Sequence, residues 1–225
     1  PEYGPWLYTA LNRGRFNFDC YGTTTHELGH AVESALSVGR AARPSLKGVP
    51  GACAVETMAN IFCDTRFAMI GVKTSTEDID PIDQMAIENM ISGCQMAGPS
   101  LVELRTWRWM YDHPDATPAE LRQAVLQIAD NVWSEFYAQY YGPDPYHLTA
   151  AYQHMIGYPL YLANYVLSGI ALQQVRAYMQ GHELAPEIKR MCAIGRLTPD
   201  AWMIRAVGEP LSAQPMLREA ERVLR

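Results

Sequence analysis

The sequence predicts a mainly α-helical protein, because helix start and stop signals recur along the chain and strand-like sequence is confined to one stretch. Residues 117–120 (Thr-Pro-Ala-Glu) have the order of a capping box with proline at the first helical position, and Gly142 is the expected end of that helix. Residues 198–200 (Thr-Pro-Asp) repeat the start signal. The aromatic-rich residues 3–20 are the only plausible strand. We therefore expect helices from Thr24 onward.

Length and charge favour a single domain that does not bind nucleic acid. The 225 residues can bury a sizeable core, and they contain no internal repeat, low-complexity tract or linker. One domain over residues 1–225 is therefore predicted. The formal net charge is −6 and no basic run is present, which argues against a nucleic-acid partner.

Cysteine usage and hydropathy predict a cytoplasmic protein that does not enter a membrane. The five cysteines are an odd set with no close pair, so a disulfide framework is not expected and a reducing compartment is favoured. Residues 155–175 carry no charge, but they include Pro159, Asn164, two glutamines and three tyrosines. Such a composition indicates a buried helix beside a polar site and not a membrane span.

Residues 26–30 (His-Glu-Leu-Gly-His) carry the strongest chemical signal in the chain. On a helix, His26 and His30 share one face and can each give a nitrogen to one zinc ion. Glu27 lies about 100° further round the helix, where it can reach a metal-bound water without ligating the metal. The pattern predicts zinc-assisted hydrolysis of a peptide bond with Glu27 as general base.

A structural explanation of the same residues is available. Thr24 and Glu27 have the spacing of a capping box, in which Glu27 only bonds back to the Thr24 backbone N–H. Gly29 weakens a purely structural helix by about 1 kcal/mol relative to alanine, yet it opens space where a backbone or substrate could approach the histidines.

A catalytic zinc needs a third protein ligand, and Glu56 is the candidate. It lies near the start of a predicted helix over residues 52–70 and is surrounded there by apolar residues, where an unpaired carboxylate is costly to bury. The alternative is a first-turn glutamate that complements the helix dipole. Asn60, four residues further on, could hold one histidine through a hydrogen bond or be an ordinary polar position.

A tyrosine-rich segment provides candidate donors for the oxyanion of acyl transfer. Tyr158, Tyr161 and Tyr165 recur at helical spacing, so they are expected on one helix face with His154 one turn before them. Phenol and imidazole both donate well to a developing alkoxide. The alternative is a packed aromatic core.

Together these motifs resemble the catalytic half of the thimet oligopeptidase and oligoendopeptidase F family of zinc metallopeptidases. Glu56 follows His26 by 30 residues, and His154, Tyr158 and Tyr165 follow it by 128, 132 and 139 residues, close to the family's spacing. The ending from Thr198 also resembles the family's closing helices.

The resemblance implies a zincin-like helical catalytic domain, with the His-Glu-x-x-His helix followed by a Glu-bearing helix. It assigns His26, His30 and Glu56 to one zinc ion per chain and Glu27 to the general base. Tyr165, His154 and Tyr158 become oxyanion and substrate contacts, and oligopeptides or flexible segments become the substrate.

Two features differ from the family. Glu33 stands where the family usually has a histidine, and the family's members are much longer than this chain. Because this sequence supplies hardly any of the second lobe of those enzymes, we expect that self-association or a partner chain covers the cleft, or else that the site is shallow and accepts flexible segments of larger proteins. A related alternative is an angiotensin-converting-enzyme-like dipeptidase or carboxypeptidase. A non-catalytic peptide-binding module is disfavoured by the intact Glu27.

Overall fold

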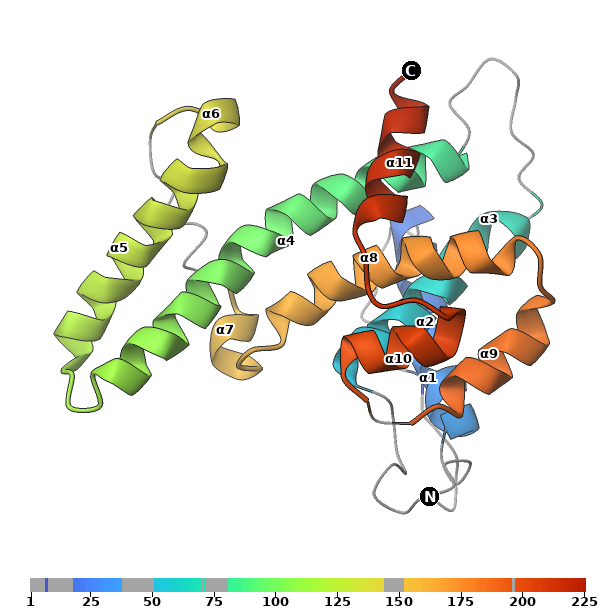
Figure 1. Ribbon diagram of the computed structural model, residues 1–225, viewed down its shortest axis with the longest axis horizontal. Helices are drawn as coiled ribbons and strands as arrows, with labels where there is room; N and C mark the ends of the chain where they lie inside the picture. The colour runs from blue at the N-terminus through green and yellow to red at the C-terminus, as the bar shows by residue number, and fades with distance from the viewer. Residues whose placement is uncertain are drawn as a thin grey trace. The chain divides into compact units, whose positions relative to one another are not determined.

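The structure is a computed structural model that describes residues 7, 18–37, 51–69, 71, 81–143, 152–195 and 197–225. The described residues are mainly helical and contain no strand, which confirms the mainly α prediction. The helices in chain order (Figure 1) are α1 Phe18–Ser37, α2 Ala52–Asp64, α3 Arg66–Met69, α4 Pro81–Asp112, α5 Pro118–Phe136, α6 Ala138–Tyr141, α7 His154–Gly157, α8 Leu162–Met179, α9 Leu184–Cys192, α10 Pro199–Val207 and α11 Gln214–Val223.

Helix α1 begins earlier than the sequence predicts. It starts at Phe18, so the last three residues of the predicted strand over residues 3–20 are helical; Leu7 has no regular secondary structure and the other residues lie outside the described part. The hydroxyl of Thr24 donates to the Cys20 carbonyl at 2.8 Å, as a threonine inside a helix does. Thr24 is therefore not an N-cap, and the capping-box explanation of Glu27 is wrong.

The predicted helix over residues 52–70 is divided in two. Helix α2 ends at Asp64, and Thr65 separates it from the short α3. The Thr65 hydroxyl donates to the Phe62 carbonyl at 2.7 Å and so satisfies one of the last carbonyls of α2. Ile70 lies outside the described residues, and Gly71 has a left-handed φ of +68°, which suits the expected helix end.

Two helix boundaries are confirmed because their signals are local. Thr117 caps α5 through a complete capping box with Glu120, and a proline opens the first turn. Helix α10 follows Thr198 and ends at Gly208, whose φ of +88° is a left-handed C-cap that glycine adopts without strain.

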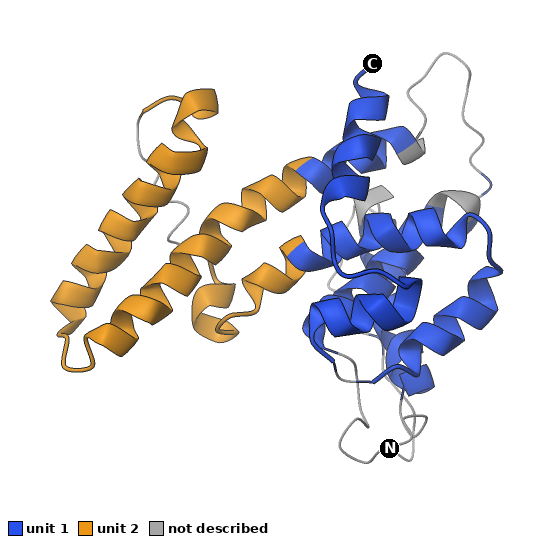
Figure 2. Ribbon diagram, in the orientation of Figure 1, with its two compact units in different colours: residues 1–90, 167–225 blue, residues 91–166 orange. Residues whose placement is uncertain are grey.

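The chain divides into two compact units, residues 1–90 with 167–225 (unit 1) and residues 91–166 (unit 2) (Figure 2). The core of unit 1 is drawn from α2, α8, α9 and α10 and is centred on the fully buried Trp202. Its buried members are Cys53, Ala54, Met58, Ile61, Ala171, Leu172, Val175, Ile188, Met191, Cys192, Trp202, Met203 and Ala206.

Unit 2 has a smaller core. Val102 of α4 packs with Ala129 and Val132 of α5, and partly buried neighbours such as Tyr137 and Met155 complete the cluster. The Tyr137 hydroxyl donates to the Cys94 carbonyl at 2.5 Å. The single catalytic domain over residues 1–225 stays a prediction.

Two further observations concern membrane crossing and disulfide bonds. None of the helices that the structure describes combines the length and the apolar character that crossing a bilayer requires. None of the five cysteines, all of which lie in the described part of the chain, forms a disulfide.

Candidate metal centre

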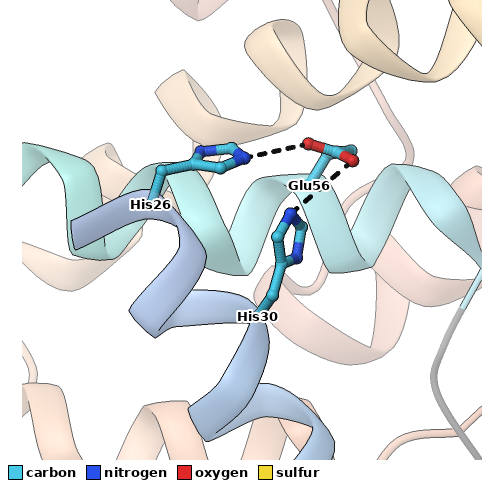
Figure 3. Close-up of side chains that lie close together, drawn as sticks. All are labelled: His26, His30 and Glu56. Atoms are coloured by element: carbon cyan, nitrogen blue, oxygen red, sulfur yellow. Dashed lines mark ion pairs between the residues drawn. The ribbon is translucent and has the colours of Figure 1, made fainter. Parts of the chain in front are cut away.

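Helix α1 carries His26 and His30 on one face, as their spacing predicts. The two ring centroids lie 4.7 Å apart and the ring planes are nearly perpendicular, at 88°. Both imidazoles point toward Glu56, which projects from α2 (Figure 3). The structure therefore brings together the three residues that the sequence proposes as zinc ligands.

The distances suit a tetrahedral metal ion. His26 Nε2 lies 3.4 Å from one oxygen of the Glu56 carboxylate, and His30 Nε2 lies 3.8 Å from the other. One ligand atom from each residue can be chosen so that all lie within 4.8 Å of one another. Zinc bonds of about 2.0–2.2 Å place tetrahedral ligands roughly 3.3–3.5 Å apart, so small side-chain rotations are enough.

Gly29 explains how α1 and α2 come so close at this point. A Cβ at position 29 would lie 2.6 Å from the Cα of Ala59, a separation that real Cβ atoms do not show. Only glycine allows the two backbones to meet there. The contact lies between the two histidines of α1 and beside Glu56 and Asn60 of α2, so it sets the spacing of the cluster.

His26 is held between two oxygen atoms. Its Nδ1 lies 3.1 Å from the Asn60 side-chain oxygen, while its Nε2 faces Glu56. Because both ring nitrogens face acceptors, the ring needs either a second proton or a cation at Nε2. Burial alone would lower the pKa of His26, but Glu56, Glu27 and Asn60 together outweigh burial and raise the pKa above 6.5. Asn60 thus makes the contact that the sequence suggested.

His30 lies in a different electrostatic environment. Burial lowers the pKa of His30 below 6.5, and the charge of Glu56 offsets only part of that effect. A neutral imidazole is the form that binds a metal. The Nδ1 of His30 is buried and has no hydrogen-bond partner among the described residues.

Glu27 stands beside the cluster without belonging to it. It is half-buried on α1, and its charge raises the pKa of both His26 and His30. Glu27 is therefore close enough to act electrostatically on both histidines but lies outside the ligand set, and its role as general base stays a prediction.

Glu33 is an unexpected buried carboxyl group on α1. Its residue is 1% exposed, and neither side-chain oxygen has a hydrogen-bond partner among the described residues. Burial raises the pKa of Glu33 to about 7, and the nearby Ser37 hydroxyl offsets part of the rise. Glu33 is therefore largely protonated below neutral pH.

The tyrosine segment belongs to unit 2 and is not one helix face, so that prediction is wrong. His154 lies on the short α7, which ends at Gly157; Leu160 has a left-handed φ of +62°, and α8 starts only at Leu162. Buried Glu103 stabilises this break, because its carboxylate accepts the backbone N–H of Leu160 at 2.5 Å. The sequence gives no local sign of that pairing.

The three tyrosine side chains nevertheless gather around His154. The Tyr165 hydroxyl lies 3.2 Å from His154 Nε2, and the two rings meet edge to face. The rings of Tyr158 and Tyr161 lie 5.7 and 6.3 Å from the His154 ring. Tyr158 is 65% exposed, which suits a contact residue better than a core residue.

Arg66 is a second residue whose position the sequence does not reveal. It lines a pocket of about 290 Å³ in unit 1 together with Gly22, Thr23, His26 and Cys63. An arginine ten residues after the Glu of a metal cluster has no motif of its own, so only the three-dimensional arrangement identifies it.

Comparison of the chain with protein-family models, with curated proteins and with solved structures finds no significant match.

Proposed function

We propose that this protein is a zinc-dependent peptidase that hydrolyses peptide bonds in oligopeptides or flexible segments. The observation that carries the proposal is the convergence of His26, His30 and Glu56, whose ligand atoms lie within 4.8 Å of one another. Two imidazoles and one carboxylate form a catalytic zinc set, since they leave a fourth position for water. The resemblance to the thimet oligopeptidase and oligoendopeptidase F family supports the same assignment.

Zinc bound by these residues would polarise the scissile carbonyl and lower the pKa of its water toward about 7. Glu27 takes the proton of the attacking water and passes it to the nitrogen of the leaving amine. Asn60 holds His26 so that its Nε2 faces the metal position.

We propose that Tyr165 stabilises the oxyanion of the tetrahedral intermediate. Its hydroxyl donates a hydrogen bond to the tetrahedral oxygen, and His154, 3.2 Å away, orients the hydroxyl. Tyr158 contacts the substrate. This part of the proposal rests on the family's order of motifs and on the contacts within the His154 cluster.

The metal content of purified variants tests the proposal directly. We expect one tightly bound zinc per chain, measured by elemental analysis, and loss of that zinc in His26→Ala, His30→Ala and Glu56→Ala, because two ligands do not hold the ion firmly. His113→Ala is the matched control, since the His113 ring is exposed and stacks on Trp109.

Activity is then measured on a mixed peptide library with and without a chelator. Hydrolysis that stops with the chelator and returns with zinc supports the proposal. Full zinc occupancy in Glu56→Ala contradicts the ligand assignment. A zinc-loaded protein that binds peptides but cleaves none is instead a peptide-binding module.

A further inference from the structure

The connection between α7 and α8 is a tight turn with an unusual residue at its third position. The Tyr161 N–H donates to the Tyr158 carbonyl at 3.1 Å and so closes a turn over residues 158–161 (Tyr-Pro-Leu-Tyr). Pro159 fixes a negative φ at the second position, and Leu160 has a φ of +62° at the third. This combination defines a type II turn, in which the third position normally holds glycine or asparagine.

Leu160 is strained in this turn. Among the residues that the structure describes, it is the one residue other than glycine with a left-handed backbone. That conformation brings the Cβ of an L-residue too close to the following carbonyl oxygen. Leu160 is 46% exposed, so burial of its side chain offsets little of the strain. A strained residue of this kind persists only where the surrounding structure holds it, and such residues are concentrated at functional sites.

Glu103 of α4 makes the contact that holds Leu160. Its carboxyl oxygen accepts the Leu160 N–H at 2.5 Å, and Glu103 is only 4% exposed. A carboxyl group so deeply buried is costly without a hydrogen bond, so the contact constrains both partners. Val102, the preceding residue of α4, belongs to the small core against which Met155 of α7 packs. Adjacent residues of α4 therefore fix both α7 and the turn that follows it.

The turn connects the two members of the His154–Tyr165 pair. His154 is the first residue of α7 before the turn, and Tyr165 lies near the start of α8 after it. The Tyr165 hydroxyl lies 3.2 Å from His154 Nε2, and the ring of Tyr161, the last residue of the turn, lies 5.3 Å from the Tyr165 ring. Because eleven positions separate the pair along the chain, a change of backbone within the turn moves the hydroxyl relative to the imidazole.

We propose that Glu103 is a positioning residue for the oxyanion donor Tyr165. By holding Leu160 in the left-handed conformation, Glu103 keeps α7 and α8 in the arrangement that sets the Tyr165 hydroxyl beside His154. Glu103 acts through the backbone and does not itself touch the reacting atoms. A donor that is held in place before the substrate binds needs no reorganisation as the oxyanion forms, which makes its stabilisation effective. The inference rests on the proposed peptidase function.

The geometric part of the inference is tested without turnover. NMR of protein with ¹⁵N-labelled histidine reports the ring nitrogens of the six histidines, and the signals absent in His154→Ala belong to His154. Tyr165→Phe gives the signals of a His154 ring that has lost the hydroxyl contact. Glu103→Met keeps the length of the side chain but removes the acceptor, so it should move the His154 signals toward those of Tyr165→Phe. Glu103→Gln should move them less, because a neutral amide accepts more weakly.

The kinetic part uses a peptide that a mixed library identifies as cleaved. Glu103→Met should lower kcat by about 10- to 100-fold, the cost of a small misplacement of a catalytic group. In a Tyr165→Phe background it should lower kcat little further, because the donor that it positions is already absent. Adding Leu160→Gly to Glu103→Met should recover most of the lost kcat, because glycine adopts the left-handed conformation without strain. Glu135→Met, at an exposed position of unit 2, is the control and should change neither kcat nor the His154 signals.

Several results would overturn the inference. Unmoved His154 signals in folded Glu103→Met do so without any activity measurement, and if that variant does not fold, unmoved signals in Glu103→Gln do the same. A loss of kcat that is equal with and without the Tyr165 hydroxyl, or that Leu160→Gly does not recover, shows that Glu103 supports the fold and not the donor. A chain that binds no zinc and cleaves no peptide contradicts the proposed function instead, while the NMR comparison still decides whether Glu103 sets the His154–Tyr165 geometry.

Discussion

Unit 1 sets its histidines beside a carboxylate, whereas unit 2 sets its histidine beside a phenol. In unit 1 both imidazoles face the 4% exposed side chain of Glu56, and that arrangement is favourable only with a positive charge between the partners. In unit 2 the Tyr165–His154 contact joins two groups that can both be neutral. The cluster around Glu56 in unit 1 is therefore suited to binding a cation, whereas the Tyr165–His154 pair in unit 2 is suited to donating a hydrogen bond.

The two units also support their polar groups differently. In unit 1, the helix that carries Glu56 also contributes Met58 and Ile61 to a core drawn from four helices. Unit 2 has a smaller core, and the hydrogen bond from the Leu160 N–H to the Glu103 carboxylate is a long-range contact that helps to fix the backbone near the tyrosines. Ligand geometry in unit 1 should therefore tolerate disturbance better than donor geometry in unit 2.

The largest expected effect is on the carboxylate chemistry of unit 1. Glu27→Gln should lower kcat by about 10²–10⁴, because the amide cannot accept the proton of the attacking water. Zinc content and peptide affinity should stay unchanged, which elemental analysis and calorimetry check. Unaltered turnover would remove Glu27 from the mechanism.

Removal of the Tyr165 hydroxyl in unit 2 should lower kcat somewhat less. Tyr165→Phe removes the hydroxyl that lies 3.2 Å from His154 and should lower kcat by about 10²–10³ with little change in KM. The measurement is steady-state kinetics on the cleaved peptide. If kcat does not change, the tyrosines form a packed aromatic cluster and the difference between the units disappears.

Ion pairs provide a matched stability test. Arg176→Ala in unit 1 should cost about 2–4 kcal/mol, because Asp64, with its side chain 18% exposed, loses its partner. Arg105→Ala in unit 2 should cost less than about 1 kcal/mol, because its partner Glu135 is 53% exposed. Urea denaturation of both variants measures the costs, and equal costs would contradict the difference in burial.

A smaller and pH-dependent effect is expected from the two buried glutamates. The carboxyl of Glu33 has a pKa of about 7 in the folded protein against an ordinary 4.5, so the folded state holds a proton that the unfolded state has released. Stability is therefore lost as pH rises from about 4.5 to 7, and Glu33→Gln should gain up to about 3 kcal/mol above pH 7. Thermal melts of both proteins without zinc, from pH 5 to pH 8, measure the difference.

Glu103→Gln is the comparison variant in unit 2. Its carboxylate has a partner in the Leu160 N–H, so the neutral amide should weaken that bond and cost about 1 kcal/mol. Above pH 7, therefore, Glu33→Gln should stabilise the protein and Glu103→Gln should destabilise it. A Glu33→Gln variant that is destabilised at every pH would show that this carboxylate has a partner when charged.

Sequence reasoning succeeded where the cause is local. The helix starts at Thr117 and Thr198 and the pairing of His26 with His30 depend on residues within one or two helical turns. Glu56 was found because a lone carboxylate stands out on an apolar helix. The break around Leu160 was missed because its partner, Glu103, lies 57 residues away in the chain. The position of Arg66 was missed because the pocket it lines is formed by residues of α1, α2 and α3.

The contact at Gly29 has a consequence for genetics. A mutational scan under selection for activity would report position 29 as intolerant as the ligands themselves, although glycine has no group to offer a metal or a substrate. Even alanine would push its methyl group to 2.6 Å from the Ala59 Cα and separate the helices that bear the ligands. Position 29 would be intolerant because glycine allows α1 and α2 to lie close together. Intolerance to substitution therefore identifies residues that set the geometry of the centre as well as residues that take part in its chemistry.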